Sequence, residues 1–91
     1  MSHLDEYREE IDELDEEFAE LFEKRFHVVK NIIDYKIENH LPILDEGREL
    51  EIIEKNTDRI EDEDLKKYFQ KVYQYMITVS KEYQEEVLSE K

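Results

Sequence analysis

The chain contains no cysteine and no tryptophan, and it has only one glycine and one proline among its 91 residues. Without cysteine it has no disulfide framework and no thiol chemistry, which suits a reducing cytoplasm. So few glycines and prolines leave little material for turns, which favours a few long helices over a sheet. No apolar run approaches the length of a membrane span, and the N-terminus lacks the basic and apolar regions of a signal peptide.

Basic residues are also scarce. The chain has 13 Lys and Arg but 27 Asp and Glu, which gives a net charge of −14. A chain with no basic stripe is not expected to bind nucleic acid or an anionic membrane. Most of the acidic residues are expected to form a solvated surface. The length predicts a single domain over residues 1–91, with a small core that gains from oligomerisation.

The apolar spacing predicts an all-α fold of three helices. The first runs from about Leu4 to Glu38, the second begins near Asp45, and the third begins near Asp62, where acidic residues suit a helix N-terminus. The first helix is too long to be covered by two shorter ones, so we expect an intertwined helical homodimer. The apolar positions of the second and third helices are Leu50, Ile52, Ile53 and Ile60, and Leu65, Phe69, Val72, Met76, Val79, Tyr83 and Val87.

Two cations, Arg25 and Lys36, interrupt the apolar stripe of the first helix. Burying a cation costs several kcal/mol unless an anion or hydrogen-bond partners meet it. The stripe therefore predicts either a site for an anion or an internal ion pair, for example with Asp15. Arg8 precedes Arg25 by 17 residues, which is about 25 Å along a straight helix. Arg8 can therefore share a small ligand with Arg25 only if a second chain supplies it.

Further polar residues recur at helical spacing in the other two helices. Asp45, Arg48 and Glu49 fall at i, i+3 and i+4 in the first turn of the second helix, and Ser80 and Gln84 lie one turn apart in the third. Taken singly, capping and dipole compensation explain Asp45 and Glu49, and a solvated face explains the other pair.

No metal or cofactor chemistry is readable from the sequence. Glu23 and His27 lie four residues apart, but no third ligand stands at a suitable spacing, so we expect no metal site. Ser80 has no neighbouring histidine to activate it as a nucleophile. The chain also has no glycine-rich phosphate loop.

Taken together, these positions resemble the all-helical chorismate mutases of the AroQ class. The resemblance spans nearly the whole chain and includes the segment Arg8–Asp15 and the turn Pro42-Ile43-Leu44-Asp45. The polar positions that match the family in order and spacing are Arg8, Arg25, Lys36, Asp45, Arg48, Glu49, Ser80 and Gln84.

The resemblance implies a cytoplasmic isomerase of aromatic amino acid biosynthesis, in the shikimate pathway. Such an enzyme converts the dianion chorismate to prephenate by a Claisen rearrangement, with no cofactor. The protein would hold the substrate in a chair-like shape and stabilise negative charge on the ether oxygen as its bond breaks. Arg25 and Arg8 of the partner subunit would hold the two carboxylates, and Lys36 and Gln84 would donate hydrogen bonds to the ether oxygen.

The resemblance also assigns the remaining positions of the catalytic and binding set. Glu49, helped by the backbone at Asp45, would orient the substrate hydroxyl, while Arg48 and Ser80 would complete the polar lining. Two alternatives stay open. Similar proteins of the same fold eliminate pyruvate from isochorismate, although the complete Asp45-x-x-Arg48-Glu49 set favours the mutase. A non-catalytic acidic helical bundle that binds another protein would not require the eight polar positions to converge.

Overall fold

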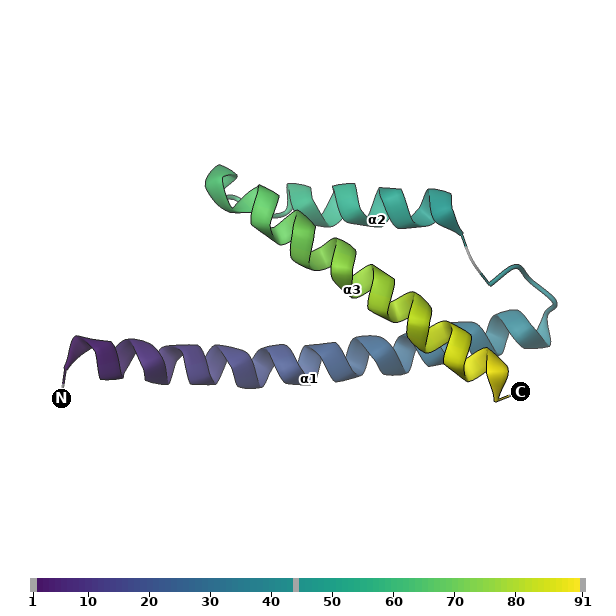
Figure 1. Cartoon of the computed structure of the whole chain (residues 1–91), viewed down its shortest axis with the longest axis horizontal. Coiled ribbons are helices and arrows are strands. Elements are labelled where there is room, and N and C mark those ends of the chain that lie inside the picture. Colours follow the sequence, from purple (N-terminus) through teal and green to yellow (C-terminus); the bar gives the residue numbers. More distant parts are fainter. Residues whose placement is uncertain (1, 44, 91) are drawn as a thin grey trace.

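The computed structural model describes residues 2–43 and 45–90, so Leu44 of the turn motif lies outside the described residues. The described chain forms three helices and no strand: α1 (His3–Glu38), α2 (Glu46–Asp58) and α3 (Glu63–Ser89). The all-α class and the three helices are therefore confirmed. In Figure 1 the long α1 forms the base, α2 lies apart from it, and α3 runs diagonally between them.

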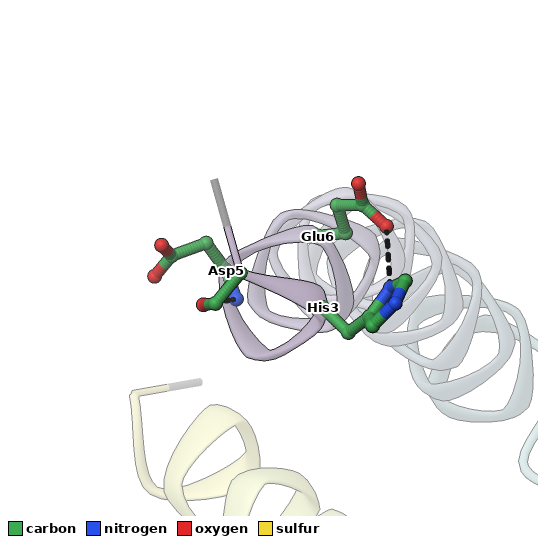
Figure 2. A network of polar contacts seen from close by, with 4 residues as sticks. His3, Asp5 and Glu6 are labelled. Carbon is green, nitrogen blue, oxygen red and sulfur yellow. Dashed lines mark hydrogen bonds and ion pairs between the residues drawn. The ribbon is translucent and has the colours of Figure 1, made fainter.

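Each helix begins at a side chain that caps its free backbone N–H groups. The hydroxyl of Ser2 accepts from the N–H of Asp5 at 3.2 Å, and on the same first turn the His3 ring lies 3.4 Å from the Glu6 carboxylate (Figure 2). Asp45 and Asp62 cap α2 and α3 in the same way. These two aspartates therefore mark the helix starts, as the sequence predicted.

The end of α1 is a Schellman motif with a histidine in the position that usually holds glycine. The N–H of Leu41 donates to the carbonyl of Lys36 at 2.8 Å, and the N–H of His40 donates to Ile37 at 3.3 Å. His40 has a φ of 55°, which is in the left-handed region. This turn sends the chain back past the last turn of α1, toward the start of α2.

The second helix is shorter than the apolar pattern suggested, and Ile60 is not part of it. α2 ends at Asp58, and the N–H groups of Arg59 and Ile60 donate to the carbonyls three residues earlier, as in a tightened final turn. Ile60 therefore belongs to the connection between α2 and α3.

The core of the single chain is small and lies around α3, which contacts both other helices. Its buried apolar residues are Ile33, Ile53, Ile77 and Val87. The rings of Phe26 and Tyr83 join α1 to α3, with centroids 5.4 Å apart. Other expected apolar positions, Leu50, Leu65 and Val72 among them, remain exposed in the single chain.

The N-terminal part of α1 extends beyond the ends of the other two helices (Figure 1). Its apolar residues are at least 55% exposed: Leu4, Tyr7, Ile11, Leu14, Phe18 and Leu21. The chain measures 57 × 27 × 16 Å with a radius of gyration of 16.7 Å, whereas a compact domain of this length would have about 12 Å. A long apolar stripe is therefore left without cover in one chain.

Candidate active site

A pocket of about 810 Å³ lies between the three helices, and it gathers most of the polar positions singled out in the sequence. Its apolar wall comes mainly from α1, where Val29, Ile32 and Ile33 face the pocket, and is completed by Ile52 of α2 and Ile77 of α3. Seven of the eight predicted polar residues line it: Arg25, Lys36, Asp45, Arg48, Glu49, Ser80 and Gln84.

Arg25 reaches the pocket from the middle of α1 and is held by groups of α3. Its Nη1 donates to the hydroxyl of Ser80 at 3.3 Å, and Ser80 is only 3% exposed. The guanidinium carbon lies 5.8 Å from the centroid of the Tyr73 ring, whose hydroxyl accepts from Asn56 of α2 at 3.0 Å. The guanidinium has five N–H donors, so those that Ser80 does not use remain for an anion.

The internal ion pair that the sequence left open for Arg25 is not formed. Asp15 is exposed on α1, and no carboxylate in the described part of the chain lies within 4.0 Å of the Arg25 guanidinium. Of the two interpretations of this cation, a site for an external anion is the one that agrees with its surroundings.

Lys36 comes from the last turn of α1 and is held by the loop that follows the Schellman motif. Its Nζ donates to the carbonyl of Ile43 at 3.1 Å, and the side chain is half-buried. An ammonium group has three protons, so this bond leaves two for a ligand. The loop therefore fixes the ammonium at the pocket without using up its donors.

The N-terminus of α2 supplies a carboxylate and a cation to the pocket. Asp45 acts as the N-cap, because its Oδ1 accepts from the N–H of Arg48 at 3.0 Å. The Arg48 side chain is largely exposed and lies 4.0 Å from Glu51. Capping thus accounts for the Asp45 side chain, and the position of Asp45 orients the first turn that carries Arg48 and Glu49.

Glu49 lines the pocket and forms an ion pair with a residue that sequence reasoning missed. Its Oε2 lies 2.8 Å from Nζ of Lys81 on α3, and the two side chains are 22% and 36% exposed. Lys81 itself does not line the pocket. These two residues meet because of the way in which α2 and α3 cross. The spacing of residues along the sequence does not predict this contact.

Gln84 lies one turn beyond Ser80 on α3 and lines the same pocket. It is half-buried, and within the described residues its side-chain amide donates no hydrogen bond. An uncommitted amide donor in a largely apolar wall is suited to a ligand oxygen. Lys24, which precedes Arg25 and is exposed, also lines the pocket and was not singled out in the sequence.

Arg8 is the one predicted residue that the single chain does not bring to the pocket. It is exposed in the uncovered half of α1, and it precedes Arg25 by 17 residues. Its contribution therefore remains a prediction that depends on a second chain.

The charge balance of the pocket is opposite to that of the whole chain. Among the described lining residues, Lys24, Arg25, Lys36 and Arg48 are cationic, while Asp45 and Glu49 are anionic. The pocket thus has two more cationic than anionic residues within a chain of net charge −14. Such a local excess matches a small dianion.

Metal binding and membrane insertion gain no support from the described residues. They contain no group of three or more His, Asp or Glu side chains arranged to hold a metal ion. No described helix combines the length and the apolar character needed to cross a bilayer.

Comparison with known proteins gives one family. A family model described as chorismate mutase type II matches residues 7–85, a segment that contains all eight predicted polar positions. No curated protein and no solved structure gave a match.

Proposed function

The chain belongs to the type II chorismate mutase family, and on that premise we propose that it is a chorismate mutase that converts chorismate to prephenate. The observation that carries the proposal is the convergence of Arg25, Lys36 and Arg48 on one pocket of a strongly acidic chain. The proposed reaction serves aromatic amino acid biosynthesis in the cytoplasm.

The reaction is a unimolecular rearrangement in which one C–O ether bond breaks as one C–C bond forms. It needs no nucleophile, no proton transfer and no cofactor. The protein contributes by holding a flexible dianion in its reactive shape and by stabilising the charge that develops on the ether oxygen. A pocket with an apolar wall and a few fixed donors is suited to both tasks.

Arg25 binds one carboxylate of the substrate in this proposal. Its planar fork can donate two parallel hydrogen bonds to a carboxylate. Ser80 and the Tyr73 ring already hold the guanidinium in place, so little side-chain freedom is lost when the ligand binds. Arg8 of the partner subunit binds the other carboxylate, and Arg48 adds positive charge at the edge of the pocket.

Lys36 and Gln84 act on the ether oxygen. That oxygen gains negative charge as its bond breaks, so donors directed at it bind the transition state more strongly than the substrate. Lys36 has two free protons beside its bond to Ile43, and the Gln84 amide is uncommitted. Glu49 accepts a hydrogen bond from the substrate hydroxyl, close to the backbone of Asp45.

We propose further that the active protein is an intertwined homodimer. The uncovered apolar stripe on the first half of α1 and the elongated shape of the chain support this. A second α1 packed along that stripe would cover its apolar residues. It would also bring a second Arg8 toward the pocket, which no single straight helix can do.

The test is to incubate the purified protein with chorismate and, in a separate sample, with isochorismate, and to identify the products by NMR. We expect prephenate and no pyruvate. Pyruvate from isochorismate would instead indicate the lyase of the same fold, and unchanged chorismate would overturn the proposal. Arg25→Ala should abolish the conversion, whereas Arg59→Ala, an exposed arginine outside the pocket, should leave it intact.

A further inference from the structure

The ion pair between Glu49 and Lys81 differs in position from the pair that Lys66 forms with Glu63. Lys66 and Glu63 lie 2.9 Å apart on successive turns of α3, away from the pocket. Glu49 and Lys81 lie 2.8 Å apart and join α2 to α3, and of the two only Glu49 lines the pocket. Partly exposed ion pairs contribute about 0–1 kcal/mol to stability, so stability alone is a weak reason for this arrangement.

The geometry leaves one oxygen of Glu49 for a ligand. Lys81 takes Oε2, and a carboxylate has two oxygens that both accept hydrogen bonds. A charge-assisted bond at one oxygen restrains the carboxylate plane. The second oxygen, Oε1, then has a fixed direction from which to accept a hydroxyl proton of a molecule in the pocket.

The charge of Glu49 also needs compensation if the pocket holds a dianion. A carboxylate beside two further negative charges repels them, and the repulsion is stronger in a partly dehydrated pocket than in water. Lys81 places a positive charge next to that carboxylate and is not itself a lining residue of the pocket.

We propose that Lys81 is a positioning residue for Glu49, an inference that rests on the proposed function. Lys81 holds the Glu49 carboxylate in the orientation that receives the substrate hydroxyl, and it neutralises the charge of Glu49 beside the dianion. It does not touch the substrate. Because the hydroxyl contact exists both before and during the reaction, Lys81 contributes to substrate binding more than to the chemical step.

The experiment is a double-mutant cycle on the full chain with chorismate as the substrate. Lys81→Met should raise KM by about tenfold and change kcat by less than about threefold. In a Glu49→Gln background, where the Glu49 carboxylate is replaced by a neutral amide, the same Lys81→Met change should shift KM by less than about twofold. Lys81→Arg keeps the charge and a donor, so it should restore nearly the parental KM.

The matched control is Lys66→Met, which removes an ion pair of similar length on the same helix, and it should leave KM and kcat unchanged. If Lys81→Met does not fold, Lys81→Gln replaces it. A raised KM in Lys81→Gln supports the inference, and a parental KM overturns it.

Three results would overturn the inference. A tenfold KM effect that persists in the Glu49→Gln background would mean that Lys81 contacts the substrate itself. A lower melting temperature with unchanged KM would reduce the ion pair to a structural contact. A parent protein that leaves chorismate unchanged would overturn the proposed function and this inference with it. The first two results, obtained with an active parent protein, would overturn this inference alone.

Discussion

Arg8 and Arg25 lie 17 residues apart on α1, about 25 Å along the helix axis, so one chain cannot place both on one small ligand. If two chains share each site, Arg8→Ala and Arg25→Ala damage the same site from different subunits. Each change removes a forked contact to a carboxylate, worth about 3 kcal/mol if each hydrogen bond to a charged group contributes about 1.5 kcal/mol. We expect kcat/KM to fall by about two orders of magnitude in either variant.

Mixing the two inactive variants should restore activity. When equal amounts are unfolded and refolded together, about half of the dimers contain one chain of each kind. One of the two sites in each mixed dimer receives both arginines, so about a quarter of all sites regain the complete set. The refolded mixture should therefore reach about a quarter of the parental rate, measured as chorismate consumption at saturating substrate.

The control uses the double variant Arg8→Ala/Arg25→Ala refolded with the parent chain. Neither site of that mixed dimer has both arginines, so the rate should fall to about half of that of the same two proteins kept apart. Native mass spectrometry would show whether mixed dimers have formed. Mixed dimers without restored activity, or an Arg8→Ala monomer with the parental rate, would refute the shared site.

Three further predictions follow from the pocket and from the end of α1. Gln84→Glu places a carboxylate, with an ordinary pKa of about 4.3, beside the developing ether anion. Its kcat should fall by about a hundredfold at pH 7.5 and recover toward acid, where that carboxyl is protonated and donates; a pH–rate profile identical to the parental one would contradict this role. In a salt series at fixed pH, kcat/KM should stay flat or rise up to physiological ionic strength, because salt first screens repulsion from surface charges beyond about 8 Å, and should fall at higher salt. A steep fall from the lowest salt would instead mean that long-range attraction dominates. His40→Gly should raise the melting temperature by a few degrees at fixed protein concentration, since glycine adopts positive φ at about 1 kcal/mol less cost than other residues, and a lower melting temperature would contradict this.

The parts of the site that the sequence predicts are those encoded within one helix or at its ends. Arg25 and Lys36 are visible because a cation on an apolar stripe requires a partner. Asp45 and Asp62 are visible because capping residues have a recognisable place before a helix. These local signals predict the three helices and single out Arg25 and Lys36. The other polar residues of the pocket, Asp45, Arg48, Glu49, Ser80 and Gln84, are assigned to the site by the family resemblance.

The parts that the sequence does not predict depend on how the helices cross. Lys81 meets Glu49, and Asn56 holds Tyr73 behind Arg25, only because α2 and α3 pack at one particular angle and register. The apolar pattern likewise extended α2 to Ile60, because periodicity does not register the tightened turn that ends the helix at Asp58. The spacing of residue types along the sequence contains no information about these contacts between helices.

The bond between Lys36 and the Ile43 carbonyl gives one side chain two duties that mutation cannot separate. The ammonium group proposed to act on the ether oxygen also braces the connection that leads into α2, and that helix carries Arg48 and Glu49. A substitution at Lys36 would therefore alter the shape of the opposite wall as well as remove a charge. Such a substitution would lose both the proposed contact to the ligand and the contact that holds the loop. A variant of this fold with another residue at position 36 would need a different contact to hold the loop before α2.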